Sequence, residues 1–173
     1  MFKTRWLVVL FVTYFFISFG SVCPTDGADV MAGQTLHIDI PVKLDKANVV
    51  FNIDHLALMG DMPFSLGHLN LVANHFGDWN TKGKIIAVFH SDAAYVLLND
   101  KTYNANRNIS TGNPYKEIFA GLMKKGVQIE MCGATATFNH WVNADFLPGV
   151  IVNTDAMVRV TQLVQEGYVQ IKE

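Results

Sequence analysis

Short apolar runs recur along the chain from Ala47 onward, and polar or turn-forming segments separate them. Five runs have the length of strands and are rich in Val and Ile; they cover 48–53, 84–89, 127–131, 149–152 and 168–171. Continuous apolar runs of this length are typical of strands that are covered on both faces. The pattern therefore predicts a sheet of about five strands inside the domain.

The segments between these runs have helical features. One helix is predicted at about 63–76, ended by Gly77, and a second at 115–125, ended by Gly126. A third follows the N-cap residues at 153–155, with Met157, Val160 and Leu163 or Val164 facing inward. The polar segment 99–114 is interpreted as a connection. Alternating strands and helices predict an α/β fold, a three-layer α/β/α arrangement with a mostly parallel sheet.

The first 20 residues have the features of a secretory signal peptide. Lys3 and Arg5 precede an apolar run over 6–19, and small residues stand near Gly20. We predict a signal peptide over 1–20, an N-terminal lead-in arm over 21–46 and an α/β domain over 47–173. The run is shorter than the ~20 residues that cross a bilayer, so stable membrane insertion is not expected. The mature protein is predicted to be exported, to a periplasm or outside the cell.

Two features of the N-terminal arm bear on its structure. Residues 35–42 alternate between apolar and polar side chains, which favours an edge strand or an extended arm. Cys23 and Cys132 are the two cysteines, too few for a disulfide scaffold or a zinc site made of cysteines alone. A Cys23–Cys132 disulfide is one interpretation. The preferred interpretation is that Cys132 is a free thiol.

Charge and motifs exclude several classes of function. Removing Lys3 and Arg5 with the signal peptide changes the formal net charge from −2 to −4, and no basic stripe is present, so nucleic acid is not an expected partner. Segment 59–63 has one glycine and no Lys-Ser/Thr pair, so no phosphate loop follows the first strand. No G-x-S-x-G motif is present. No cofactor is predicted.

Polar residues follow three of the predicted strands. In an open parallel sheet the ligand site lies beyond the carboxyl ends of the strands, so these residues are expected at one edge. They are Asp54 and His55 after the first strand, His90, Ser91 and Asp92 after the second, and Cys132, Gly133 and Thr135 after the third.

Cys132 is the strongest candidate for chemistry among these residues. The small residues after it allow close backbone approach, and Thr135 or Thr137 is expected to cap a short helical stretch that contains Trp141. Amide donors and the helix dipole at a helix N-terminus favour the thiolate, which is the nucleophilic form of cysteine. The alternative is that Cys132 is a small buried hydrophobic residue.

Three neighbours are candidate assistants of Cys132. His90 and His55 can orient or deprotonate a thiol, with Asp92 beside them, although capping or structural hydrogen bonding is the commoner role of such histidines. A Cys132, His55 and His90 cluster also has donors that suit copper or zinc, but no spacing motif supports a metal site. We therefore predict no metal ligands and keep the Cys/His metal-binding protein as an alternative.

The sequence resembles the DsrE/DsrF-like family over about 49–173. The resemblance rests on the strand-then-cysteine segment GVQIEMCGAT at 126–135, on LPGV at 147–150 before a capped helix, and on the ending EGYVQI. It implies a small α/β protein that assembles as a trimer or hexamer and carries sulfur as a persulfide on Cys132. Apart from this resemblance, Gly133 and Thr135 are binding candidates beside Cys132. His140 and Trp141, in the loop after Cys132, are expected to close over the site or to form a subunit contact.

Taken together, the sequence predicts an exported DsrE-like protein that accepts sulfane sulfur on Cys132 and presents it to a partner. Such a protein is a carrier more than an enzyme that turns over substrate. The alternatives are an oligomeric binding or scaffolding module without covalent chemistry, and the Cys/His metal-binding protein. The relatives that relay sulfur are cytoplasmic, so an exported member would need other donor and acceptor proteins.

Overall fold

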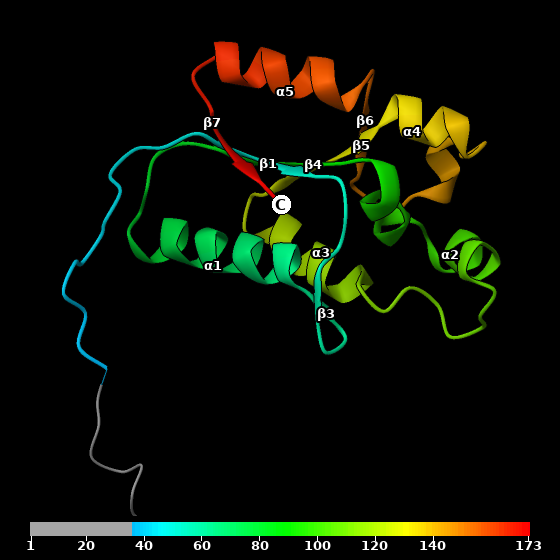
Figure 1. The fold of residues 1–173 in the computed structure, drawn as a ribbon, viewed down its shortest axis with the longest axis horizontal. Helices are drawn as coiled ribbons and strands as arrows, with labels where there is room; N and C mark the ends of the chain where they lie inside the picture. Colours follow the sequence, from blue (N-terminus) through cyan, green and yellow to red (C-terminus); the bar gives the residue numbers. More distant parts are fainter. Residues whose placement is uncertain (1–35) are drawn as a thin grey trace, which may run out of the picture. The chain divides into compact units, whose positions relative to one another are not determined.

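A parallel sheet forms the centre of the domain over 42–173 (Figure 1). The computed structural model describes residues 36–173, so the predicted signal peptide and Cys23 lie outside the described residues. The strands follow the order β6-β5-β4-β1-β7, and all neighbours are parallel. Their bounds are β1 Val49–Ile53, β4 Ile85–Phe89, β5 Gln128–Cys132, β6 Ile151–Asn153 and β7 Val169–Lys172. The predicted five-stranded parallel sheet is confirmed.

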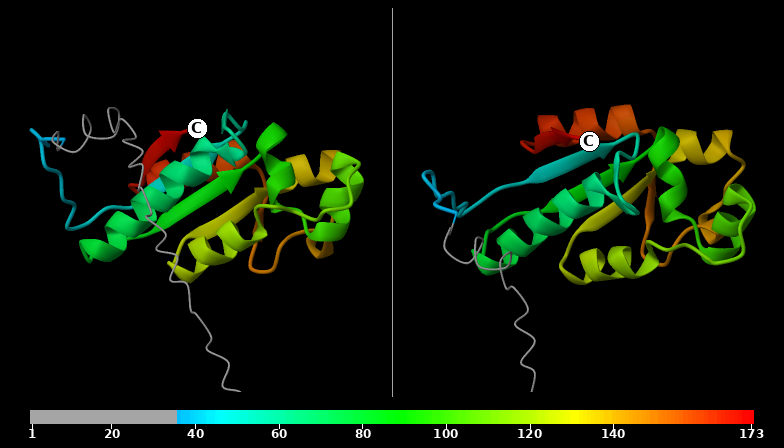
Figure 2. Two further views of the ribbon diagram at one scale, coloured as in Figure 1. Left: turned by 90° about the horizontal axis from the view of Figure 1, so that it is seen from below. Right: turned by 60° about the horizontal axis from the view of Figure 1, so that its bottom comes forward.

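The apolar runs become strands because both faces of the sheet are covered. Every residue of β1 and β4 is buried, whereas the edge strands β6 and β7 contain no buried residue. Helices α1 (Phe64–Asp78) and α3 (Lys116–Lys124) lie on one face, and α5 (Ala156–Gln165) lies on the other (Figure 2). The three-layer arrangement is therefore confirmed.

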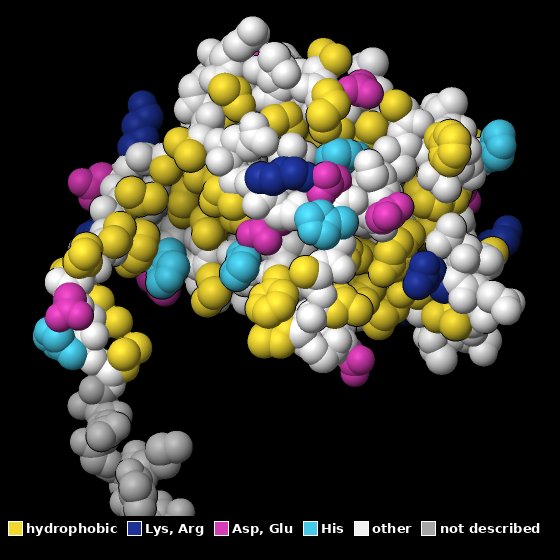
Figure 3. Space-filling view, in the orientation of Figure 1, with side chains coloured by type: hydrophobic (Ala, Val, Ile, Leu, Met, Phe, Trp, Pro, Cys, Tyr) yellow, Lys and Arg dark blue, Asp and Glu magenta, His cyan; other side chains and the backbone are white. Residues whose placement is uncertain are grey.

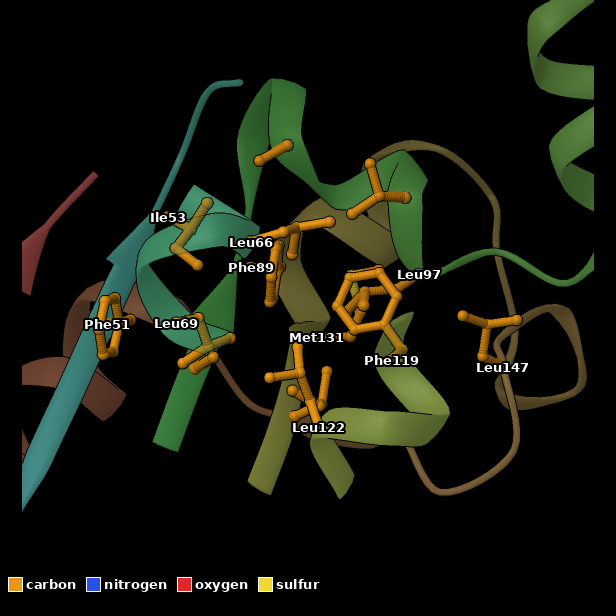
Figure 4. Close-up of a cluster of buried hydrophobic side chains, with 14 of the residues drawn as sticks. Phe51, Ile53, Leu66, Leu69, Phe89, Leu97, Phe119, Leu122, Met131 and Leu147 are labelled. Atoms are coloured by element: carbon orange, nitrogen blue, oxygen red, sulfur yellow. The ribbon is translucent and has the colours of Figure 1, made fainter. Parts of the chain in front are cut away.

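Two apolar clusters fill the spaces between the layers. The larger one joins the sheet to α1, α3 and the 3₁₀ helix η1 (Ser91–Leu97), with Phe51, Phe89 and Phe119 fully buried (Figure 4). The smaller one lies under α5 and contains Val50, Ile86, Val88, Cys132, Ala156, Val160 and Leu163. Because successive strand residues face opposite sides, the position of Cys132 in β5 directs its side chain towards α5.

The polar segment 99–114 is more regular than predicted. It contains α2 (Asp100–Arg107), whose N-cap Asn99 accepts a hydrogen bond from the Thr102 amide at 2.9 Å. Asn108 ends α2 in the left-handed conformation, with φ 53°. The segment is too polar for a helix to be recognised from an apolar face, because Tyr103 is the one buried residue of α2. The capping residues were therefore the available sequence signal for this helix.

Two helices differ in detail from the prediction. α1 continues through Gly77 to Asp78, and the left-handed residue after it is Asn80. In α5 the buried residues include Val160 and Leu163, but Met157 is exposed and Ala156 takes the inward position. The predicted ending of the second helix at Gly126 is correct, since α3 stops at Lys124 and Gly126 has φ 86°.

The smaller elements complete the described chain. A two-stranded antiparallel hairpin, β2 (Leu58–Met59) and β3 (Met62–Pro63), precedes α1, and α4 (Gly133–Phe138) and the 3₁₀ helix η2 (Asn143–Asp145) follow β5. None of the described helices is long and apolar enough to span a membrane.

An edge strand or an extended arm was predicted over 35–42, and the described residues 36–42 do not form an edge strand. Residues 36–42 belong to no helix or strand, and the apolar side chains of Leu36, Ile38, Ile40 and Val42 are exposed. Alternation alone does not make a strand, because a strand also needs a hydrogen-bonding partner, and Pro41 has no amide hydrogen to donate.

A buried ion pair ties α5 to β5. Glu130 is 1% exposed, and its carboxylate accepts hydrogen bonds from Arg159 at 2.9–3.1 Å, from Asn153 at 2.9 Å and from Gln128 at 2.7 Å. Burial by itself raises the pKa of Glu130, but these hydrogen bonds outweigh it and hold the pKa below its ordinary value. Glu130 is therefore ionised under α5, with its charge compensated.

Replacing Arg159 with Met is expected to lower the free energy of unfolding by about 3 kcal/mol, because it leaves a carboxylate buried without its cation. Chemical denaturation of parent and variant measures the loss. Lys116→Met is the matched control, because it removes the cation of the exposed Asp100–Lys116 pair, and it should leave the midpoint nearly unchanged. Equal losses in the two variants would contradict this prediction, because the buried pair would then contribute no more than the exposed one.

Candidate functional site

The polar residues predicted at the strand ends do lie at one edge of the sheet. Asp54 and His55 follow β1, His90 follows β4, and Cys132 ends β5. The register pairs Phe89 with Met131 and Cys132 with Asn153, so His90 is one position beyond the last β4–β5 pair and stands beside Cys132. Figure 3 shows histidine, acidic and basic side chains close together near the place where Figure 1 marks the C-terminus.

Cys132 is buried, and its sulfur accepts two backbone hydrogen bonds. The side chain is 3% exposed and belongs to the cluster under α5. The Thr135 amide donates to Sγ at 3.5 Å and the Ala156 amide at 3.3 Å, so the sulfur faces the first turns of both α4 and α5. Two converging amide donors are an arrangement that stabilises negative charge on sulfur.

Gly133 allows the two helices to meet at this sulfur. A Cβ atom at Gly133 would lie 2.4 Å from the Asn153 carbonyl oxygen and 3.0 Å from the Thr154 carbonyl oxygen. Only glycine permits this approach between the start of α4 and the loop before α5. The role of Gly133 is therefore to let the backbone pack closely.

The helix after Cys132 differs from the prediction. Cys132 itself is the N-cap of α4, and α4 ends at Phe138, before Trp141. Thr135 does not cap it; the Thr135 side-chain hydroxyl accepts a hydrogen bond from the Ser91 amide at 3.1 Å. The Trp141 ring packs edge-on against Phe146, with ring centroids 6.4 Å apart. Thr135 thus connects the sulfur to the end of β4.

His90 stands next to Cys132 but directs its ring elsewhere. Nε2 lies 2.8 Å from Asn52 Oδ1, and Nδ1 lies 3.0 Å from Ser91 Oγ. Burial lowers the pKa of His90, and the negative charges of Asp54 and Asp155 offset only part of this effect. Both ring nitrogens are engaged, so His90 is a positioning residue for the β4 end. Neither His90 nor His55 hydrogen-bonds to the Cys132 thiol within residues 36–173.

His55 lies in a separate, exposed cluster. Its Nδ1 is 2.6 Å from Asp54 Oδ1, and Lys172 contacts the other Asp54 oxygen. The hydrogen bonds from Lys172 and His55 lower the pKa of Asp54 to about 2. His55 therefore pairs with Asp54 instead of the thiol. Among the described residues no group of three His, Cys, Asp or Glu side chains could hold a metal ion, so the predicted alternative of a shared Cys132, His55 and His90 metal site is not formed.

Asp92 and Trp141 lie around a cavity on the other side of α4. The cavity has a volume of about 700 Å³, and Thr135 also lines it. His140 and Gly133 are not among the lining residues; His140 is an exposed turn residue with φ 58°. Five other lining residues were not candidates from the sequence, because their segments showed no functional motif; they are Tyr95, Asn106, Arg107, Phe138 and Asn139.

Acid should destabilise the fold through His90. The pKa of His90 is lowered below 6.5 in the folded protein, so as the pH falls below about 6.5 the unfolded chain takes up the proton first and the free energy of unfolding decreases. His90→Gln should show a smaller decrease than the parent between about pH 7 and pH 5. His140→Gln, which changes an exposed ring, is the control and should behave as the parent. A steeper decrease in His90→Gln than in the parent would contradict this assignment.

Comparison with known proteins agrees with this architecture. A protein of unknown function, MTH1491 from Methanobacterium thermoautotrophicum, superposes with a TM-score of 0.57 at 24% identity, covering 73% of this chain and 99% of that chain. The ychN protein from E. coli superposes with a TM-score of 0.53 at 14% identity, covering 74% and 99%. No curated protein matches the sequence. The model of the DsrE/DsrF-like family matches residues 60–172, and the chain therefore belongs to the DsrE/DsrF-like family.

Proposed function

We propose that this protein is a sulfur-relay protein that carries sulfane sulfur as a persulfide on Cys132. The observation that carries the proposal is the pair of amide donors at the Cys132 sulfur, from the first turns of α4 and α5. A sulfur-relay role is what membership of the DsrE/DsrF-like family suggests. A cysteine at a strand end with two amide donors is suited to hold the negative charge of a thiolate or a persulfide.

The transfer step is a thiol–disulfide type of exchange. The Cys132 thiolate attacks the outer sulfur of a persulfide or polysulfide donor, a new S–S bond forms at Cys132, and the donor's S–S bond breaks. The electron pair of the broken bond leaves with the donor as its thiolate. Cys132 is thereby oxidised to the persulfide and the donor is reduced to the thiol, so no further oxidant is needed. An acceptor thiolate then removes the outer sulfur in the same way.

The burial of Cys132 adds a condition to this proposal. At 3% exposure the sulfur meets a donor only after local opening, and the neighbouring parts are the short helix α4 and the loop before α5. α4 has six residues, and Ala136 is the one buried residue within it. Short segments with few buried contacts open at lower free energy than the core of a domain. The α4 segment is therefore the part that moves to admit a donor.

The location and assembly of the protein are further parts of the proposal. A cleaved signal peptide over 1–20 would export the protein to a periplasm or to the outside, where donor and acceptor proteins differ from cytoplasmic ones. A homo-oligomer, a trimer or hexamer, is the proposed assembly. Family membership is compatible with an oligomer and with sulfur partners.

A binding module without covalent chemistry is the second candidate. The observation in its favour is that His90 and His55 hydrogen-bond to Asn52, Ser91 and Asp54, so neither histidine acts on the buried thiol in the part of the chain that the structure describes. In this case Cys132 only fills the space under α5, as small apolar residues do.

Exposure of the folded protein to polysulfide should add sulfur atoms to Cys132. Mass spectrometry of the intact protein and its peptides locates the addition, and cyanide should remove the outer sulfur. Cys23→Ser should gain sulfur at Cys132 as the parent does, and the variant that carries Cys132→Ser in addition should gain none. Absence of an adduct on Cys132 in the folded parent would sink the carrier proposal and favour the binding module.

Alkylation of the Cys132 thiol should show that local opening is sufficient to expose it to a reagent. In Cys23→Ser, where Cys132 is the single thiol, labelling is expected to be slow but complete, at a rate that is independent of denaturant at low concentrations. A rate that rises steeply from the first addition of denaturant would mean that labelling requires global unfolding, and would assign Cys132 a structural role.

A further inference from the structure

The cavity beside α4 has the position and size of a small-molecule site. It lies between η1, α2 and α4, which stand together beyond the ends of β4 and β5 (Figure 1). Ligands of open parallel sheets bind beyond the carboxyl ends of the strands. The volume of about 700 Å³ lies within the range of ligand pockets, about 300–1,000 Å³. The sulfur chemistry proposed for Cys132 makes no use of this cavity.

Two opposite charges in the cavity wall have no ion-pair partner in the described part of the chain. They are the carboxylate of Asp92, from η1, and the guanidinium of Arg107, from α2. They do not pair with each other either, although both line the same space. A ligand with a single charge would meet one group of the same sign, whereas a ligand with both charges satisfies both groups.

The Arg107 side chain is held in place without losing its hydrogen-bonding capacity. Its guanidinium carbon lies 4.4 Å from the centre of the Tyr95 ring, which is a cation–π contact. A cation–π contact uses no oxygen acceptor, so N–H groups of the guanidinium stay available, and these suit a carboxylate. Arg107 is therefore preorganised for an anionic group.

The rest of the wall provides an apolar and aromatic surface. Phe138 is 85% exposed, and Trp141 lines the same cavity. A large aromatic ring left in water at the rim of a cavity is a typical contact point for a ligand. The wall thus combines one cation, one anion and an aromatic surface.

The backbone at this cavity is held in an unusual conformation. Ser91, which lines the cavity, has φ 50°, and His140, between the lining residues Asn139 and Trp141, has φ 58°. Left-handed conformations are unfavourable for residues other than glycine, and they cluster at ligand sites because the surrounding structure must hold them. The hydrogen bond from the Ser91 amide to the Thr135 hydroxyl is one such restraint.

From these observations we propose that the cavity binds a zwitterionic amino acid or short peptide with an apolar or aromatic side chain. The ligand's carboxylate pairs with Arg107, its ammonium group pairs with Asp92, and its side chain packs against Phe138 and Trp141. The site is independent of Cys132, although Thr135 contributes to both: its amide donates to the sulfur and its side chain lines the cavity.

The test uses one aromatic scaffold with different charges. L-Phenylalanine and glycyl-L-phenylalanine carry both charges, phenethylamine lacks the carboxylate, and 3-phenylpropanoate lacks the ammonium group. Calorimetric titration of the parent should give at least one zwitterion a dissociation constant about tenfold lower than those of the two singly charged compounds. NMR shifts should map to the cavity. Equal binding of all four compounds, no binding, or shifts elsewhere would overturn the proposal.

Variants that remove one charge show which cavity residue pairs with each charged end of the ligand. Arg107→Gln should weaken the zwitterion and 3-phenylpropanoate but not phenethylamine, and Asp92→Asn should weaken the zwitterion and phenethylamine but not 3-phenylpropanoate. Lys101→Gln, an exposed cation of α2 outside the cavity wall, is the control and should bind as the parent. Cys132→Ser should also bind as the parent, so a failure of the sulfur proposal stays distinct from a failure of this one. The opposite assignment of the variants would contradict the proposed orientation.

Discussion

Parallel pairing of β4 with β1 and β5 is the constraint on which the rest of the structure depends. β4 is buried on both faces, so a change of its neighbouring strands or of its register would expose apolar side chains. This register brings the ends of β1, β4 and β5 to one edge, and with them His90 and Cys132. It also decides which side chains face α5, since a shift of one residue would turn Cys132 to the opposite layer.

The layer under α5 is unusual because it accommodates polar groups in an otherwise apolar space. Asn52, His90 and Glu130 are buried there beside Cys132, and each has hydrogen-bond partners. Buried polar groups are tolerated when they are satisfied, and they restrict the packing to one arrangement. The close approach at Gly133 belongs to the same arrangement, because it brings the amides of Thr135 and Ala156 to the sulfur.

The short helix α4 separates two possible sites. On its inner side lies the buried sulfur, and on its outer side lies the cavity with Asp92 and Arg107. Thr135 contacts both, through its amide and its side chain. A movement of α4 that admits a donor to Cys132 would therefore also change the cavity wall.

The sequence by itself determined the layers, the five strands of the parallel sheet and the strand-end position of Cys132, because apolar runs and capping residues are local signals. Tertiary structure alone decided that Cys132 is buried under α5, that His90 bonds to Asn52 and not to the thiol, and that the Cys132, His55 and His90 cluster is not formed. It also placed Arg107, from α2, on the same cavity as Asp92. These contacts depend on register and on packing between distant segments, whereas a sequence pattern reports only on neighbours along the chain.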